Sequence, residues 1–223
     1  MWHKTIGSEI LRTAAAWKIE RYRVDTLQTS LKSTSSRKIG DLVQVREESA
    51  DPTSAPYNGL TYFGLDAVES GTGEILFKRT AAEQCIRSRS KVFKAGDLLY
   101  GRLRAYLNKV AYVGSDTPLG TCSGEFYVLT PDIRQVQPLY LQWVLSSEAM
   151  VAHVTLRLAG ATHPRLALED LLEFYIDLPK PKEQAAAEVV ISNAISRRHA
   201  LLEELRLLPI QTANEVKKLT NSG

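Results

Sequence analysis

The C-terminal part of the sequence contains a glycine-free run, Glu183 to Leu219, in which apolar residues recur every three or four positions. This spacing predicts one long amphipathic helix. The apolar residues form an approximate heptad seam, which an isolated helix would expose to water. We therefore expect a coiled-coil-like pair, most simply with a second copy of the chain. Arg198 interrupts the seam, and Pro209 is expected to kink or end the helix. The expected pairing residues are Ala187, Ile191, Ala194, Leu201, Leu205 and Leu208.

The residues before this helix follow a different pattern. From Lys38 to about Lys180, short apolar or alternating runs are separated by turn residues, which is typical of a β-rich domain. Helical periodicity is expected within it over Pro138 to about Val154 and over Leu168 to Leu172. The chain is therefore predicted to be an α+β protein, with a β-rich domain followed by the long helix. The expected strands are Leu42–Arg46, Leu60–Leu65, Glu74–Lys78, Asp97–Gly101, Lys109–Val113, Glu125–Leu129 and Phe174–Leu178.

These patterns divide the chain into three segments. Apolar residues at helical spacing after Trp2, followed by a polar Ser- and Thr-rich run, predict an N-terminal helical extension and linker over residues 1–38. The β-rich domain is placed at residues 39–181, and the spacer or dimerisation helix at residues 182–223.

Charge is concentrated in one part of the chain. The whole sequence has 28 Lys and Arg against 25 Asp and Glu, a formal charge of +3 that assigns no partner. Between Arg87 and Lys109 there are seven basic residues and one acidic residue, Asp97, so this segment alone has a formal charge of +6. Basic residues interleaved with tyrosines are expected at phosphate contacts, and a solvated basic strand face is the alternative. The candidate DNA-contacting residues here are Arg87, Arg89, Lys91, Arg102, Arg104, Tyr106 and Lys109.

A second candidate region is the loop from Arg157 to Arg165. Gly160 permits unusual backbone angles, and the loop offers several hydrogen-bond donors with little apolar bulk. Its candidate residues are Arg157, Thr162, His163 and Arg165. A solvated connecting loop is the alternative interpretation.

The sequence lacks the common catalytic and cofactor-binding signatures: GxGxxG after a strand, GxxxxGK[ST], HExxH and GxSxG. Cys85 and Cys122 have no CxxC or His-rich companion, so neither a zinc site nor a disulfide scaffold is expected. Asp66, Glu74 and Lys78 are the residues that a metal-dependent nuclease would have to use. We expect no cofactor and no bound metal.

The predicted location is the cytoplasm. Two cysteines without a disulfide pattern fit a reducing compartment. The first residues contain charges and no apolar core of a secretory signal, and no stretch approaches the roughly 20 apolar residues that span a bilayer. We therefore expect neither export nor a membrane partner.

Five stretches, taken together, carry a resemblance to a known family. They are the runs TYFGLDAVESGTGEI (Thr61–Ile75), FKAGDLLYGRLRAYLNK (Phe93–Lys109), CSGEFYVL (Cys122–Leu129), GATHPRL (Gly160–Leu166) and IDLPKPKEQ (Ile176–Gln184). In this order they resemble one target recognition domain and the following helix of the specificity subunit of type I restriction–modification systems. The resemblance covers about residues 39 to 205.

The resemblance implies a non-catalytic subunit that reads DNA. Such subunits bind a DNA-methyltransferase subunit, which holds S-adenosylmethionine and modifies adenine, and in complete systems a motor–endonuclease (restriction) subunit. It also implies that the region of Arg102, Arg104 and Lys109 and the loop from Thr162 to Arg165 lie on or near double-stranded DNA. The long helix would hold recognition domains apart and dock the methyltransferase.

The chain departs from the family's usual pattern in having one recognition domain and one spacer helix instead of two. Two copies, paired antiparallel through residues 183 to about 208, would rebuild the full arrangement with twofold symmetry, which predicts a homodimer and a gapped palindromic site. Residues Trp2 to Lys38 match nothing in the family's usual start. They fit a partner-docking helix, a cap on the domain or the tail of an ancestral first spacer helix.

Two hypotheses from other classes stand beside this one. A metal-dependent nuclease would use Asp66 and Glu74 on a DNA-binding scaffold and would cleave plasmid with magnesium. A protein-interaction adaptor would dock a partner on the helix and would show no salt-dependent affinity for duplex DNA.

Overall fold

The structure is a computed structural model, and it describes residues 35–158 and 163–220. The predicted N-terminal extension up to residue 34 and the candidate Thr162 lie outside the described residues. The strands are β1 (Ser36–Lys38), β2 (Val43–Val45), β3 (Ser49–Ala50), β4 (Thr61–Phe63), β5 (Arg79–Thr80), β6 (Ser90–Lys94), β7 (Leu98–Gly101), β8 (Val110–Tyr112), β9 (Leu119–Cys122), β10 (Phe126–Pro131) and β11 (Tyr175–Asp177). The α-helices are α3 (Pro138–Leu145), α4 (Glu148–Arg157), α5 (Leu168–Leu172) and α6 (Pro181–Thr220), and the 3-10 turns are η1 (Ile39–Asp41), η2 (Leu65–Ala67) and η3 (Ala105–Leu107).

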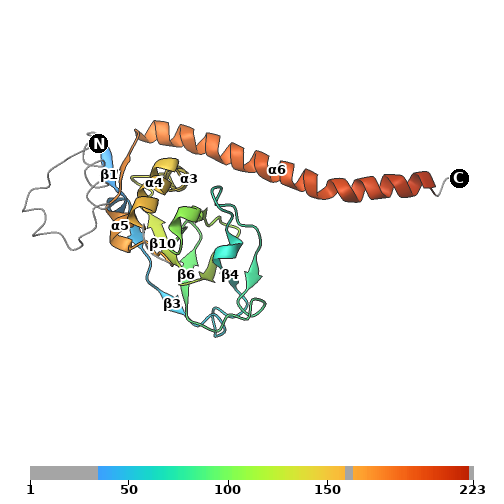
Figure 1. Cartoon of the computed structure of the whole chain (residues 1–223), viewed down its shortest axis with the longest axis horizontal. Coiled ribbons are helices and arrows are strands. Elements are labelled where there is room, and N and C mark those ends of the chain that lie inside the picture. The colour runs from blue at the N-terminus through green and yellow to red at the C-terminus, as the bar shows by residue number, and fades with distance from the viewer. Residues whose placement is uncertain (1–34, 159–162, 221–223) are drawn as a thin grey trace, which may run out of the picture.

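The described strands form three sheets. A four-stranded antiparallel sheet has the order β2-β10-β7-β8, and a five-stranded sheet has the order β3-β6-β9-β4-β5, in which β4 and β9 are parallel. The third sheet pairs β1 with β11. Figure 1 shows the sheets gathered in one domain, from which α6 projects well beyond the strands.

Strand β10 shows why the domain has two cores. Successive residues of a strand point to opposite faces of its sheet. Tyr127 and Leu129 therefore belong to the core cluster that also contains side chains of α3, α4 and α5. Phe126 and Val128 belong to the other cluster, which includes residues of the five-stranded sheet such as Phe63. The four-stranded sheet thus lies between a helical layer and the second sheet, and both of its faces are buried.

Close packing in the second core depends on one small residue. The rings of Phe63 and Phe93 stack with centroids 5.1 Å apart. A Cβ atom at Gly120 would lie 2.4 Å from the Phe93 ring and 2.5 Å from the Thr61 carbonyl oxygen. Only glycine lets β9 approach β4 and β6 at this point.

The long helix is anchored at its start and then leaves the domain. The buried Gln184 donates to the carbonyl oxygen of Pro179 at 2.9 Å, and its amide oxygen accepts from the Gln137 N–H at 3.1 Å. Farther along, Arg198 pairs with Glu69 at 2.7 Å. Apolar side chains from Leu201 to the C-terminal end of α6 are exposed.

The α+β prediction, with a β-rich domain followed by a long helix, is confirmed, while three local predictions need correction. The helix expected from Pro138 to Val154 is two helices, because the Ser147 hydroxyl accepts from the Met150 N–H and caps the start of α4. The run Glu74–Lys78 is not a strand and contributes only a bridge from Ile75 to Val68.

The third correction concerns the end of the first predicted segment. The linker expected through Lys38 is wrong for Ser36–Lys38, since these residues pair with β11 as part of the domain.

Pro209 was expected to kink or end the long helix, and α6 does not end there but continues to Thr220. A proline in an exposed helix removes one hydrogen bond, and water can satisfy the carbonyl group that is freed. In Figure 1 the axis of α6 changes direction in its C-terminal part.

Candidate nucleic-acid interface

The structure brings together the two regions that the sequence singled out. Leu103 and Arg165 form an antiparallel bridge. The Arg104 N–H donates to the Pro164 carbonyl oxygen at 2.8 Å, and the Leu166 N–H donates to the Arg102 carbonyl oxygen at 2.9 Å. The basic segment after β7 and the segment before α5 therefore run side by side, although about 60 residues separate them in the sequence.

The basic segment has an uncommon backbone. Arg104 (φ 48°, ψ 51°) and Asn108 (φ 53°, ψ 55°) flank η3 in the left-handed conformation. A residue other than glycine adopts this conformation at a cost of roughly 1–2 kcal/mol. The Asn108 side chain donates to the Ser146 carbonyl oxygen at 2.8 Å, which holds the turn against the helical layer. The turn leaves the Arg104 and Tyr106 side chains exposed.

Cationic side chains gather around Glu125 and Tyr127 at the N-terminal end of β10. The Arg165 guanidinium donates to both carboxylate oxygens of Glu125, with Nη2 at 2.7 Å and Nε at 3.0 Å. The Arg102 Nε lies 3.9 Å from the same carboxylate. Lys91 Nζ and Arg102 Cζ lie 5.2 and 5.3 Å from the centroid of the Tyr127 ring. We call Lys91, Arg102, Glu125, Tyr127 and Arg165 the Glu125 cluster.

The cluster remains cationic overall, since three basic side chains surround one carboxylate. The hydrogen bonds from Arg165 lower the pKa of Glu125, so this group stays ionised at neutral pH. Partial burial lowers the pKa of Lys91. The buried Arg102 Nε has no hydrogen-bond acceptor among the described residues. Three cations beside an aromatic ring are suited to hold an anion such as a phosphate group.

The remaining candidates fall into two groups. Arg87 and Arg89 are exposed before β6, and Arg89 donates to the Ser49 carbonyl oxygen at 2.8 Å. His163 is also exposed. These side chains reach solvent on the same domain but outside the Glu125 cluster.

Two candidate cations are engaged by internal partners. The Lys109 ammonium donates to the carbonyl oxygens of Leu65 and Val68, both at 2.7 Å, and so ties η2 to the strand that follows η3. The Arg157 side chain is 5% exposed and pairs with Asp170 at 2.8 Å. In this arrangement their charges serve the fold and are not directed to a ligand.

Glu125 and Tyr127 were not predicted as site residues from the sequence. Their significance comes from strand pairing and from a contact 40 residues along the chain, which spacing along the sequence does not show. The available signal was the CSGEFYVL stretch, where an acid adjoins an apolar strand.

The residues proposed for a nuclease are separated by other contacts. Glu74 contacts Arg198 and lies 3.2 Å from His199 Nε2, whereas Lys78 pairs with Asp116 at 2.5 Å. Asp66 is exposed on η2. Within residues 35–158 and 163–220, no group of three or more His, Cys, Asp or Glu side chains is placed to hold a metal ion.

The expected seam of the long helix faces two environments. Ala187 packs against the helical-layer core, and Ile191 is half-buried, whereas Ala194 is exposed. The later seam residues Leu201 and Leu208 are 44% and 54% exposed. Other exposed apolar residues of α6 are Val189, Val190, Ile195, Leu202, Leu205, Leu207, Ile210, Val216 and Leu219. The part of the seam beyond the domain thus has no packing partner among the described residues.

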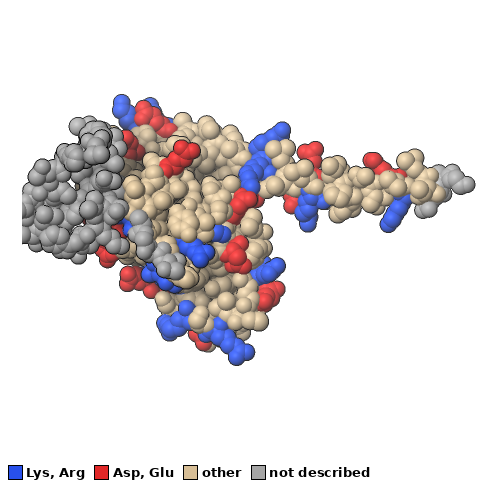
Figure 2. All heavy atoms as spheres, in the orientation of Figure 1, with Lys and Arg blue, Asp and Glu red and all other residues tan. Residues whose placement is uncertain are grey.

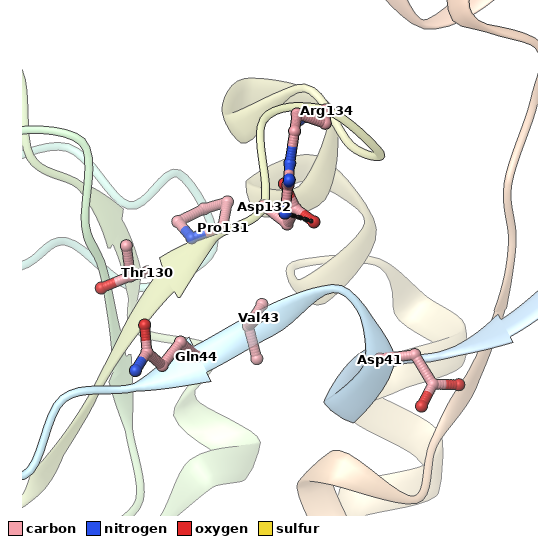
Figure 3. A pocket seen from close by; sticks show the side chains of 7 residues that line it. All are labelled: Asp41, Val43, Gln44, Thr130, Pro131, Asp132 and Arg134. Carbon is pink, nitrogen blue, oxygen red and sulfur yellow. Dashed lines mark hydrogen bonds and ion pairs between the residues drawn. The ribbon is translucent and has the colours of Figure 1, made fainter.

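The surface also has a recess of about 330 Å³, lined in part by β2 and the C-terminal end of β10. Figure 3 shows Asp132 and Arg134 next to each other above this recess, where their side chains form two hydrogen bonds of 2.9 and 3.1 Å. The recess and the Glu125 cluster lie at opposite ends of β10. On the face drawn in Figure 2, basic and acidic side chains alternate over the domain.

These features define an α+β domain with a local cationic cluster and a projecting helix whose apolar side is uncovered, an arrangement typical of a binding module that works within an assembly. The sequence matches the model of the type I restriction modification DNA specificity domain over residues 32–204. The chain belongs to this family, which confirms the resemblance seen in the sequence.

Two solved structures are similar to the chain. One, described as the structural basis of complex assembly and conformational transition of the type I R-M system, is 25% identical with a TM-score of 0.62. The other is the HsdS subunit from Thermoanaerobacter tengcongensis, 25% identical with a TM-score of 0.60. Each alignment covers 78% of this chain and 45% of the other, so the chain spans less than half of these relatives. No curated protein matches significantly.

None of the helices in the described part of the chain is both long and apolar enough to cross a bilayer.

Proposed function

We propose that the chain is a half-length DNA-specificity subunit that works as a homodimer and directs a partner methyltransferase to a gapped palindromic site. The observation that carries the proposal is the family's recognition domain joined to one helix whose apolar side is exposed beyond the domain. Such a helix is most simply covered by an equivalent helix.

A homodimer would bring together two recognition domains and two helices. The chain aligns with 45% of each similar structure, so two copies would supply about as much chain as one of those proteins. In an antiparallel pair through residues 183 to about 208, Leu201, Leu205 and Leu208 of one copy would meet the first half of this segment in the other copy, where Val189 and Val190 are exposed. A twofold axis between two identical recognition domains requires a DNA site with the same symmetry.

The Glu125 cluster and the neighbouring Arg104 are the proposed contact with double-stranded DNA. Arg102, Arg104 and Arg165 come from two segments whose backbones are held together by hydrogen bonds, so all three side chains start from one small region of the surface. Arginine can bind phosphate or the O6 and N7 edge of guanine with two hydrogen bonds. Exposed Arg87, Arg89, Tyr106 and His163 would extend this contact along the duplex.

In this proposal the subunit has no chemistry of its own. A methyltransferase subunit docks on the long helices, with a restriction subunit in complete systems, and the complex acts in the cytoplasm. Magnesium-dependent cleavage of plasmid by the isolated chain would contradict this assignment.

The proposal is tested by selecting bound duplexes from a random pool with the purified full-length chain, alone and with its co-encoded methyltransferase. A homodimer with one recognition domain per copy should enrich two inverted half-sites at a constant spacing. Affinity should fall steeply as salt is added, because phosphate contacts release counterions. A single half-site would overturn the homodimer, and no salt-dependent binding would favour the adaptor hypothesis.

A further inference from the structure

The guanidinium group of Arg165 is already occupied by a carboxylate in the free protein. Its Nη2 and Nε donate to Glu125 in the two-point arrangement that an arginine also forms with phosphate. The same carboxylate lies 3.9 Å from Arg102. Glu125 thus occupies the position in the cluster that a DNA phosphate would take.

This ion pair differs from two ion pairs that are more deeply buried among the described residues. The Asp97 side chain, paired with Arg46, is 1% exposed, and the Arg157 side chain, paired with Asp170, is 5% exposed. Arg165 and Glu125 are 47% and 27% exposed. A ligand can therefore reach the Arg165–Glu125 pair without unfolding anything.

We propose that Glu125 is a specificity-determining residue that competes with DNA phosphates for Arg165 and Arg102. This inference rests on the proposed DNA-binding function. A phosphate that takes Arg165 must break the hydrogen bonds between Arg165 and Glu125 and leaves an unpaired carboxylate beside its own negative charge. On arbitrary DNA this repulsion is not compensated, so non-specific binding is weakened.

On the cognate site the displaced carboxylate has a partner. A carboxylate accepts hydrogen bonds from the exocyclic amino group that cytosine or adenine presents in the major groove. Glu125 would then exchange Arg165 for a base while Arg165 binds phosphate or guanine. The competition therefore lowers the affinity for non-cognate sequences more than the affinity for the cognate one. The charge of Lys91 attracts DNA in both cases.

The test compares the wild-type chain with Glu125→Gln, which keeps the shape and one acceptor but removes the charge. Binding to a random 30-base-pair duplex and to the duplex selected by the wild type is followed by fluorescence anisotropy over a range of salt. We expect the variant to bind the random duplex about three- to tenfold more tightly, with a steeper salt dependence. Its preference for the selected duplex should fall. Asp116→Asn, which makes the same charge change at the exposed ion pair with Lys78, should leave both affinities unchanged.

A second variant keeps the test decisive. In an Arg165→Met background, Glu125→Gln should strengthen binding to random DNA less than it does in the wild type, because the cation that pairs with Glu125 is gone. Circular dichroism and thermal melting verify that each variant is folded.

The outcomes separate the inference from the proposed function. If the wild type binds DNA but Glu125→Gln binds random DNA equally or more weakly, Glu125 only positions Arg165 and the inference is wrong, while the proposed function stands. If the wild type shows no salt-dependent affinity for either duplex, both are overturned.

Discussion

Replacing Asp97 with alanine should destabilise the domain strongly, because one carboxylate joins three strands. The side chain is 1% exposed and accepts from Arg46 Nε at 2.9 Å and Nη2 at 3.2 Å. It also accepts from the Thr130 hydroxyl at 2.6 Å and the Lys94 N–H at 2.7 Å. These contacts connect the start of β7 with β10, with the end of β6 and with the residue after β2.

The expected loss can be worked from these contacts. Removing one partner of a buried ion pair costs about 3–5 kcal/mol, since the other charge stays behind uncompensated. The Arg46 side chain is 22% exposed and recovers some hydration, which favours the lower part of this range. The Lys94 N–H also loses its acceptor. For a protein of this size, about 3–5 kcal/mol corresponds to a fall in Tm of roughly 6–20 °C.

Urea denaturation followed by circular dichroism, at one fixed protein concentration, measures this loss in the free energy of unfolding. The matched control is Asp116→Ala, which breaks the exposed ion pair with Lys78 and should change stability by less than about 0.5 kcal/mol. A cost below about 1 kcal/mol for Asp97→Ala would refute the reasoning. Arg46→Ala in the Asp97→Ala background should cost far less than in the wild type.

Three further predictions concern binding, assembly and pH. The double charge reversal Arg102→Glu and Arg104→Glu should lower the affinity for duplex DNA at least about 100-fold, as measured by anisotropy. The mass measured by light scattering should not change. Unaltered binding would show that DNA does not contact these residues. The pair Leu201→Ser and Leu205→Ser should shift light scattering toward the monomer without changing the melting of the β-rich domain, and a persistent dimer would place the interface elsewhere. Burial lowers the pKa of His153 from 6.5 to about 4, so unfolding free energy should fall by up to roughly 3 kcal/mol as pH drops from 6.5 toward 4. The unfolded state binds the proton more readily over this window, and His153→Leu should therefore flatten the pH dependence of urea midpoints; an unchanged slope would contradict this assignment.

The architecture follows from features that are local in the sequence. The spacing of apolar residues changes at the prolines before Gln184, and this change predicts where the sheets end and the helix begins. Successive side chains of β10 alternate between the two cores, which agrees with the two buried faces of its sheet. Apolar residues recur at helical spacing on both sides of Ser146 and Ser147, so their pattern alone predicts one helix. The break between α3 and α4 depends instead on capping hydrogen bonds, which end one helix and begin the next.

The candidate site is only partly predictable for a physical reason. Charge density along the chain locates Arg102 and Arg104 but does not show whether a cation reaches solvent, and the ammonium of Lys109 binds two carbonyl groups instead. The pairing of Glu125 with Arg165 depends on the bridge between Leu103 and Arg165. Such contacts arise from tertiary packing of distant segments, which no local pattern encodes.

Multi-angle light scattering of the purified chain shows whether one recognition domain and one helix are doubled by self-association. We expect a mass near twice 24.8 kDa that is lost when Leu201 and Leu205 become serine. A monomer of 24.8 kDa at all concentrations, alone and with the methyltransferase, would contradict it.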